Sequence, residues 1–566
     1  MNKSREFSIK NSALWAAYGD ALGFITELVD ERGVFRRINT NRVQKTVSWR
    51  YMAGGRFGAE VELPAGCYSD DTQLRLATSR AIKRDGTFDV EAFAKIELTI
   101  WPTYSLGGGR GTKQAASNLS SQDVNWFTNF FNQRRGNYIK CGGNGGAMRI
   151  QPHIWAAQQK DKSKWDSFLL DVVKNTICTH GHPRGILGAV FHALSLYSAL
   201  KNGSVPSPDL WFEFVHFFSE IAVLIKNDKD MGTFWLPTWE NRAGIKLEAA
   251  FEEVKQECLN DISIIVENFK SKSERSYQNC VKQIGGINSS TRGSGTKTAL
   301  IATALSWMYG DERPDIPLTI AANCLQSDTD TIATMSGAIL GAVNPEMPSE
   351  KIMDREYIER EAIRLAQIGE GKIAEVFNYP DLMLWQPPKT QLDVVGVNQD
   401  HFLIKGLSYA HKVGNEVESQ GKGDAVWQWL KVAFGQSLLC KRRSTLPQFS
   451  KSEISHGFIF PKNIPEKKAQ TEKRNGEGYK QQSLLPDISA TDRKSERVND
   501  VDRSKNNKTI DEMTNLAINS NFDSALIGNH LKSFAKDADG IERSIAYSSI
   551  IVKALMARLR KEREQR

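Results

Sequence analysis

The sequence predicts an all-α fold for most of the chain, and two observations support this prediction. From Ser8 to about Leu384, apolar residues recur at three- and four-residue spacing, and glycine-rich breaks separate the runs. The 566 residues are 40% hydrophobic and include 13 Trp and 26 Phe, enough for a large buried core. The clearest helices are expected at 168–177, 185–200, 209–225, 247–269 and 298–308. Another helix is expected to begin near Ser12, where Gly19 and Gly23 would let a second backbone approach closely.

Shifts in composition divide the chain into four expected parts. Residues 8–390 form the main helical domain, and 391–440 form a small appendage that contains several aromatic residues. Residues 441–508 are rich in Lys, Ser, Gln, Asn, Glu and Pro with few large apolar side chains, which predicts a disordered basic linker. Helical spacing returns in 509–566 and predicts a small helical module.

The net charge of +8 is modest for this length and does not by itself imply nucleic acid. Much of it lies late, since 441–500 holds thirteen Lys and Arg against eight Asp and Glu. We expect either a nucleic-acid or protein partner for this basic C-terminal region, or a plain solvated linker and helix. There is no run of about eighteen apolar residues, and the N-terminus is polar, so we expect no membrane contact and a cytoplasmic location.

Two acidic motifs have the same layout. Tyr68-Ser69-Asp70-Asp71-Thr72 and Ser327-Asp328-Thr329-Asp330-Thr331 each come directly before an apolar run with helical spacing, so both should lie at helix N-termini. Asp, Ser and Thr are favoured N-caps, which is the simplest explanation of either motif alone. A cap needs one oxygen acceptor, however, and each motif supplies two carboxylates.

The surplus negative charge of the two motifs calls for a cation. Carboxylates and hydroxyls are hard oxygen ligands, which suit Mg²⁺ or Mn²⁺ and a paired-metal centre better than zinc. The seven cysteines contain no CxxC pair that would suggest a zinc site.

Two glycine-rich segments are candidates for binding phosphate. Residues 107–112 (Gly-Gly-Gly-Arg-Gly-Thr) and 142–146 (Gly-Gly-Asn-Gly-Gly) would let backbone N–H groups approach phosphate oxygens. Neither matches a Walker or dinucleotide-binding fingerprint, and each alone would more often be a simple turn.

Five motifs in this order resemble the ADP-ribosylglycohydrolase family over residues 12–345. They are the two acidic motifs together with Gly19-Asp20-Ala21-Leu22-Gly23, Gly143-Asn144-Gly145-Gly146-Ala147-Met148-Arg149 and Thr179-His180. The resemblance implies an orthogonal multi-helix bundle in which two Mg²⁺ or Mn²⁺ ions assist cleavage between ADP-ribose and a modified acceptor. The C-terminal extension is not covered by it.

The resemblance also implies roles for individual residues. Glu27, Asp70 and Asp71 would be catalytic, with Glu27 or Asp70 activating a water molecule. The metal ligands would be Ser69, Asp70, Asp71, Asp328, Asp330 and Thr331. The substrate-binding residues would be Gly109, Gly111, Gly143, Asn144, Gly145, Gly146, Met148, His180, Ser294 and Gly295. For His182 we expect a structural hydrogen bond instead.

The sequence departs from the family pattern at two points. Ser69 stands where threonine is usual, and Gln326-Ser327 precedes Asp328 where glycine or asparagine is typical, so bulk there would alter which acceptor fits. The acceptor stays open between a protein side chain, a nucleobase and a small molecule. The alternative functions are a catalytically silent ADP-ribose-binding module and another two-metal hydrolase acting on nucleotides or phosphoesters.

Overall fold

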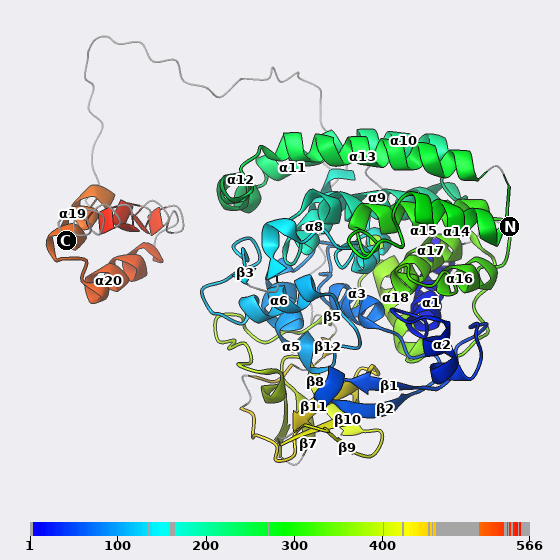
Figure 1. Cartoon of the computed structure of the whole chain (residues 1–566). Helices are drawn as coiled ribbons and strands as arrows, with labels where there is room; N and C mark the ends of the chain where they lie inside the picture. Colours follow the sequence, from blue (N-terminus) through cyan, green and yellow to red (C-terminus); the bar gives the residue numbers. More distant parts are fainter. Residues whose placement is uncertain are drawn as a thin grey trace, which may run out of the picture. The chain divides into compact units, whose positions relative to one another are not determined.

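The computed structural model describes residues 4–133, 136–158, 165–269, 271–399, 401–421, 424–450, 453–455, 457–459 and 509–536, with parts of 540–558. These residues divide into two compact units, Met1–Lys467 and Lys468–Arg566, and each is described by itself (Figure 1).

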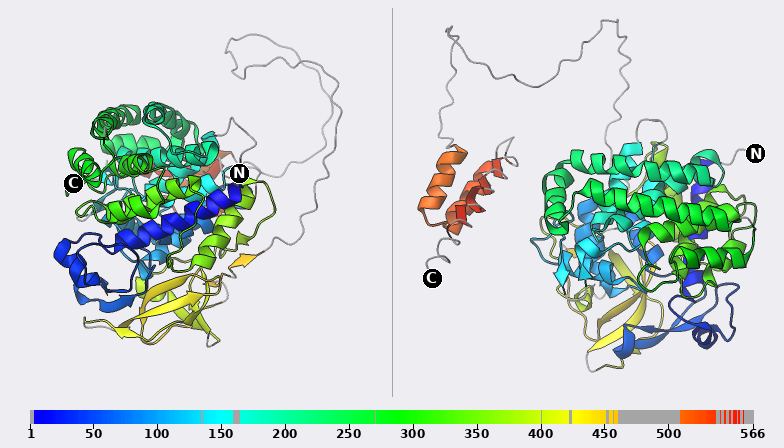
Figure 2. Two further views of the ribbon diagram at one scale, coloured as in Figure 1. Left: turned by 90° about the vertical axis from the view of Figure 1, so that its right-hand side faces the viewer. Right: turned by 45° about the horizontal axis from the view of Figure 1, so that its top comes forward.

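The first unit is a body of packed helices (Figures 1 and 2). Its helices are α1 (Arg5–Phe24), α2 (Glu31–Ile38), α3 (Asp70–Arg80), α4 (Val90–Ala92), α5 (Leu98–Ile100), α6 (Arg110–Leu119), α7 (Gln151–Trp155), α8 (Trp165–Ile177), α9 (Pro183–Asn202), α10 (Pro208–His216), α11 (Phe218–Asn227), α12 (Leu236–Ala243), α13 (Leu247–Asn268), α14 (Glu274–Gln283), α15 (Gly295–Met308), α16 (Asp315–Ala322), α17 (Thr329–Val343) and α18 (Arg355–Gly369).

The helical fold class is confirmed, and so are the expected helices, with one correction. The run at 209–225 is two helices, α10 and α11, because the chain turns at Phe217, where ψ is −12°. The runs 168–177, 185–200 and 298–308 fall within α8, α9 and α15, and 247–269 matches α13 except for its last residue, Phe269, which is the C-cap. Among the described residues, no helix is long and apolar enough to cross a membrane. All seven cysteines are free thiols.

Helices α1 and α17 pack backbone against backbone. A Cβ added at Gly19 would lie 2.4 Å from the carbonyl oxygen of Ala333, and one at Gly23 would lie 2.4 Å from that of Thr329. The contact is reciprocal, since a Cβ at Gly337 would lie 2.3 Å from the Trp15 carbonyl oxygen. Glycine is therefore required on both helices for this close approach, as the sequence predicted for Gly19 and Gly23.

Residues 395–443 form an antiparallel sheet that the sequence did not predict. Its order is β11-β10-β8-β7-β6, and β9 also pairs with β10. The strands are β6 (Val395–Asn398), β7 (His401–Ile404), β8 (Ser408–Lys412), β9 (Val417–Glu418), β10 (Ala425–Val432) and β11 (Ser437–Arg443). Buried side chains such as Leu430 and Leu438 belong to the same hydrophobic core as the helices, so this sheet and the helical body share one interior.

Shorter strands complete the first unit. They are β1 (Trp49–Ala53) paired with β2 (Ala59–Leu63), β3 (Asn132–Gln133) with β4 (Gly136–Asn137), and β5 (Val376–Phe377) with β12 (Phe458–Ile459). The range expected to be a disordered linker, 441–508, contains the last three residues of β11, which pair with β10, and the whole of β12, which pairs with β5. Residues 451, 452, 456 and 460–508 of that range lie outside the described residues.

The second unit contains α19 (Ile510–Asn519) and α20 (Ser524–Phe534). Helix α19 begins with a capping box, in which Thr509 and Glu512 each bond the other's backbone N–H. A small core of its own holds Met513, Ala517, Phe534, Tyr547 and Ile551. The Arg-rich end at 560–566 lies outside the described residues, so its role as a tether stays a prediction.

Candidate functional site

The first acidic motif begins helix α3, as the sequence predicted. Ser69 is its N-cap, and the Ser69 hydroxyl accepts a hydrogen bond from the Asp71 N–H at 3.3 Å. Asp70 and Asp71 occupy the first turn, and both side chains are buried. The capping role therefore falls to Ser69, and it leaves the carboxylates of Asp70 and Asp71 free for another purpose.

A buried aspartate on α1 accepts hydrogen bonds from two further N–H groups at the start of α3, while the Asp70 N–H donates to the Leu106 carbonyl at 2.8 Å. Asp20 accepts hydrogen bonds from the backbone of Ser69 (2.9 Å) and of Thr72 (2.8 Å), and a third from the Thr72 hydroxyl (2.5 Å). We did not assign Asp20 a role from the sequence. The sequence signal that could have indicated a role for Asp20 is a carboxylate between two small residues, Gly19 and Ala21, on a helix face expected to approach another backbone.

The second acidic motif begins helix α17. Asp328 stands at the N-cap position, but its side chain makes no capping hydrogen bond and instead accepts one from the Asn144 side-chain amide at 3.1 Å. Asp330 lies in the first turn and is buried. Capping is therefore not the purpose of the Asp328 carboxylate.

The two motifs converge. The Thr331 hydroxyl on α17 donates a hydrogen bond to Oδ1 of Asp71 on α3 at 3.3 Å. The second oxygen, Oδ2 of Asp71, is buried without a hydrogen-bond partner. Residues separated by 260 positions in the sequence thus meet across the two helix N-termini.

Glu27 joins this cluster from the segment that follows α1. Its side chain shares a hydrogen bond with Asp330. A Cβ added at Gly107 would lie 2.7 Å from Oδ1 of Asp70 and 3.9 Å from Oε2 of Glu27. Gly107 has a φ of +91°, so a residue without a side chain is favoured both by the backbone and by the neighbouring carboxylates.

Burial and mutual repulsion raise the pKa values of these acids. The pKa of Glu27 is raised to about 7, first by burial and then by the charge of Asp328. The pKa values of Asp70, Asp71 and Asp330 are raised well above the usual range, again by burial first and by neighbouring carboxylates second. Concentrated negative charge in a buried volume is costly unless cations balance it.

The chain supplies some positive charge nearby. Arg75 is buried on α3 and donates hydrogen bonds to the hydroxyls of Thr72 (2.6 Å) and Thr334 (2.8 Å). The charge of Lys113 opposes the rise in the Asp70 pKa, and that of Arg37 opposes the rise in the Glu27 pKa. Arg75, Lys113 and Arg37 were not predicted to belong to the site. Their positive charges are too few to cancel the rise in the pKa values of the acids.

The acids are not a preformed cage of metal ligands. Among the side chains that the structure describes, no group of three His, Cys, Asp or Glu is arranged so as to hold a metal ion. Two features nevertheless fit a divalent cation: the partnerless Oδ2 of Asp71, and a donor set made of carboxylate and hydroxyl oxygens. Small movements of these side chains would be required for coordination.

The glycine-rich loops lie beside the acids. The Asn144 N–H donates to the Gly293 carbonyl (2.9 Å), the Gly295 N–H donates to the Gly142 carbonyl (3.0 Å), and Gly143 pairs with Ser294. These contacts join the 142–146 loop to the segment that holds Ser294 and Gly295, which was also predicted to bind substrate. A Cβ at Gly293 would lie 3.2 Å from Oδ2 of Asp328, so this joined loop borders the acidic cluster.

Other predicted substrate-binding positions have varied surroundings. Gly109 is the N-cap of α6 with open space beside it. Gly146 packs on Thr176, and Gly295 packs on the backbone of Arg184. Met148 is buried, and its N–H donates to the Asn144 carbonyl at 3.0 Å. Close packing alone thus explains glycine at 146 and 295.

The His180 ring faces the glycine loop. The Thr179 hydroxyl accepts a hydrogen bond from Arg149 at 2.9 Å and is hydrogen-bonded to Nδ1 of His180 at 2.7 Å, which fixes the orientation of the ring. The other ring nitrogen, Nε2, lies within 3.7 Å of the places where side chains at Gly111, Gly143 and Gly145 would begin. Burial lowers the pKa of His180 to about 3, so the ring is neutral at pH 7.

His182 has the structural role that we expected. It is the N-cap of α9, and its Nδ1 accepts a hydrogen bond from the Arg184 N–H at 3.1 Å.

Gln326, one of the two departures from the family pattern, has a φ of +72° and an exposed side chain. Left-handed backbone explains why glycine or asparagine is common at such a position. The exposure of the side chain argues against the expected crowding of the site.

Comparisons with known proteins place the chain in a family. The chain matches the family model of ADP-ribosylglycohydrolases over residues 4–374, more than half of its length. It is 25% identical over 292 residues to a Danio rerio protein named ADP-ribosylhydrolase ARH3, covering 49% of this chain and 69% of that protein. A solved structure titled "ADP-ribosylglycohydrolase-related protein complex" is 18% identical, with a TM-score of 0.41, covering 65% of this chain and all of that one. The chain belongs to the ADP-ribosylglycohydrolase family.

Proposed function

We propose that this chain hydrolyses the glycosidic bond between ADP-ribose and a modified acceptor, and so reverses ADP-ribosylation. The observation that carries the proposal is the convergence of two acidic helix N-termini at which the side chains of Asp70, Asp71 and Asp328 make no capping hydrogen bond. Family membership and the similarity to a protein named as an ADP-ribosylhydrolase support the same reaction.

The acids would hold two Mg²⁺ or Mn²⁺ ions, with Ser69, Asp70, Asp71, Asp328, Asp330 and Thr331 as the ligand set. Bound divalent ions supply Lewis acidity and fix ribose hydroxyls and a water molecule. The partnerless Oδ2 of Asp71 and the raised pKa values of the acids support a bound cation here.

The remaining roles belong to side chains and backbone of the chain. Glu27 lies beside Asp70 and Asp330 and would take a proton from the attacking water. The neutral His180 would form a hydrogen bond through Nε2 with a ribose or phosphate oxygen of ADP-ribose. Backbone N–H groups of the 107–112 and 142–146 loops, apart from that of Asn144, which donates to the Gly293 carbonyl, would approach the diphosphate.

The test is release of ADP-ribose from arginine-, serine- and nucleobase-linked substrates with Mg²⁺, Mn²⁺ or EDTA. We expect release from at least one substrate, abolished by EDTA and by Asp328→Ala. Asp311→Ala, at an exposed aspartate, is the matched control and should keep full activity.

Two outcomes would reject this function. Binding of ADP-ribose without release from any substrate would mean a silent binding module. Release of phosphate or cleavage of free nucleotides, with ADP-ribosyl bonds left intact, would mean a different two-metal hydrolase. A separate proposal is that the basic C-terminal region tethers the chain to nucleic acid or to a protein. Its test is whether the full-length chain binds DNA or RNA in a salt-dependent way that requires residues 441–566.

A further inference from the structure

The chain beyond the family-matched segment contributes one turn that contacts helices α3 and α18. Residues 433–436 form this turn between β10 and β11, and Ser437 follows it as the first residue of β11; all of them lie outside residues 4–374. Gly435 has a φ of +101°, and the Val432 N–H donates to the Gln436 carbonyl at 2.9 Å, which closes the turn. The Phe434 carbonyl accepts a hydrogen bond from Arg360 on α18.

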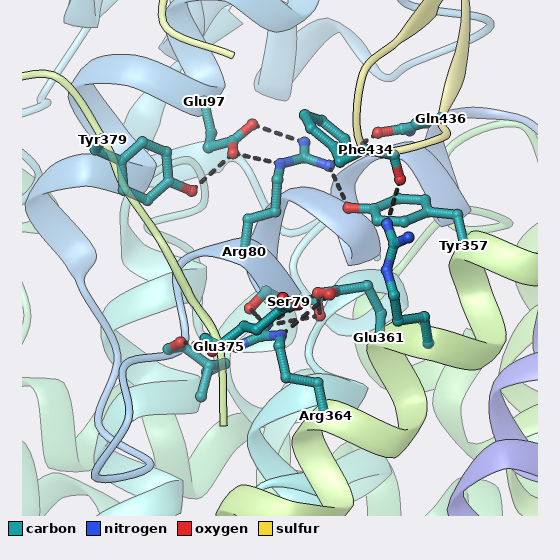
Figure 3. Close-up of polar contacts among 12 residues, drawn as sticks. Ser79, Arg80, Glu97, Tyr357, Glu361, Arg364, Glu375, Tyr379, Phe434 and Gln436 are labelled. Atoms are coloured by element: carbon teal, nitrogen blue, oxygen red, sulfur yellow. Dashed lines mark hydrogen bonds and ion pairs between the residues drawn. The ribbon is translucent and has the colours of Figure 1, made fainter. Parts of the chain in front are cut away.

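The β10–β11 turn reaches the C-terminal end of α3 (Figure 3). Arg80, the last residue of α3, forms a two-fold ion pair with Glu97 at 2.7 and 2.8 Å, and both side chains are fully buried. Its remaining nitrogen, Nη1, donates to Oε1 of Gln436 at 2.8 Å and to the Tyr357 hydroxyl at 3.1 Å. A residue of the sheet thus completes the hydrogen bonding of a buried charge on α3.

Ser437, directly after the turn, reaches the N-terminal end of α3 through Asp354. The backbone N–H and the hydroxyl of Ser437 each donate to the carboxylate of Asp354 at 2.7 Å. Asp354 also accepts a hydrogen bond from the Tyr68 hydroxyl at 2.8 Å. Tyr68 directly precedes Ser69, the N-cap of α3.

Helix α3 is therefore held at both ends by two adjacent residues, Gln436 of the turn and Ser437 directly after it. Asp70 and Asp71 lie at one end of this rigid element, and Arg80 lies at the other. A shift of the turn would take away one of the two acceptors of Nη1 of the buried Arg80, which costs free energy. The same shift would move the carboxylates at the start of α3 relative to those on α17.

We propose that the β10–β11 turn positions helix α3 for the reaction, with Gln436 and Ser437 as positioning residues for Asp70 and Asp71. This inference rests on the function proposed above. It means that the sheet of residues 395–443 is a working part of the site and that the family-matched segment alone is incomplete in this chain.

The test compares two glutamines of the same sheet in the full-length protein. Gln436→Leu removes the side-chain oxygen that accepts a hydrogen bond from Nη1 of Arg80. Gln428→Leu is the matched control, because Gln428 is equally buried but bonds Arg442 and the Gly414 carbonyl within the sheet region. Three measurements are made on each variant: melting temperature, kcat and KM for ADP-ribose release, and hydrogen exchange of the α3 amides.

We expect Gln436→Leu to speed exchange in α3 and to lower kcat roughly tenfold to a hundredfold with little change in KM, because misplacement of reacting groups by about 1 Å has effects of this size. Gln428→Leu should lower the melting temperature without either effect. Ser437→Ala should act like Gln436→Leu but more weakly, and Ser437→Thr, which keeps the hydroxyl, should restore kcat.

Equal loss of kcat in the two glutamine variants at equal loss of melting temperature would overturn the proposal. Unchanged α3 exchange in Gln436→Leu would also overturn it. If the wild-type chain releases no ADP-ribose, the proposed function fails, and the exchange measurements alone then decide whether the turn holds α3.

Discussion

The side-chain amide of Asn144 donates a hydrogen bond to Oδ2 of Asp328 at 3.1 Å, and the same nitrogen lies 3.1 Å from the Thr298 hydroxyl. Asn144 thereby holds the Asp328 carboxylate toward the glycine loops instead of toward the N–H groups of α17. A loop residue thus orients a predicted metal ligand, a relationship typical of the residues that surround metal ligands.

Asn144→Ala should lower kcat/KM about tenfold to a hundredfold, the usual cost of losing a group that orients a metal ligand. Asn268→Ala, which removes a half-buried asparagine on α13 that bonds Ile264 and Gln283, is the control and should keep full activity. Steady-state kinetics at several Mg²⁺ concentrations measure both. Unchanged kinetics in Asn144→Ala would mean that Asp328 needs no such orientation.

Asp71→Asn should abolish activity by more than about a hundredfold but stabilise the metal-free protein. The substitution replaces a buried carboxylate, one of whose oxygens has no partner, with an amide that can donate to neighbouring acids. Wild-type protein should melt at a higher temperature when Mg²⁺ or Mn²⁺ is added, and the variant should lose most of this increase. Equal metal-dependent stabilisation of the two proteins would contradict the ligand role of Asp71.

Gly19→Ala should destabilise the first unit by roughly 1–3 kcal/mol or more, because the new Cβ would lie 2.4 Å from a backbone oxygen of α17. Gly414→Ala is the control, since nothing lies within 4 Å of the corresponding Cβ there. Urea unfolding followed by tryptophan fluorescence gives both free energies of unfolding. A loss equal to that of the control would show that α1 and α17 can move apart freely.

Acidification should unfold the wild-type protein more readily than a His153→Phe variant. Burial, and then the charge of Arg149, lowers the pKa of His153 to about 3, whereas an unfolded histidine has a pKa of about 6.5. The unfolded chain therefore binds a proton more tightly, and the stability present above pH 6.5 is lost as the pH falls toward 3. The loss attributable to His153 is about 1.4 kcal/mol per pH unit in this window.

The measurement for His153 is the free energy of unfolding at pH 7.0, 6.0 and 5.0 in both proteins. Only the difference between their slopes counts, because other buried groups titrate in both. Parallel slopes for wild type and His153→Phe would refute the assignment.

Short-range features of the structure could be predicted from the sequence. Asp70 and Asp330 lie in the first turns of helices because cap residues and apolar spacing are local signals. The close approach allowed by Gly19 and Gly23 was also predicted, although the partner helix was not. The meeting of the two acidic motifs came only from the family resemblance, because no local pattern states which helices pack together.

Other features depend on contacts between distant residues. Strand β10 has buried residues on both faces, so it lacks the alternation that marks a half-buried strand. The contact between Arg80 and Gln436 joins residues 356 positions apart, and neither residue type indicates it alone. The sequence placed Asp20 in the motif Gly19-Asp20-Ala21-Leu22-Gly23 without a role, and its hydrogen bonds to the start of α3 are known only from the structure.

The contact between α1 and α17 limits how far these two helices can be redesigned. Because main-chain atoms of the two helices touch, their separation cannot be adjusted by exchanging one side chain for a slightly larger or smaller one. If the proposed function holds, engineering of this chain for a new acceptor should therefore leave these two helices untouched and vary the surface loops.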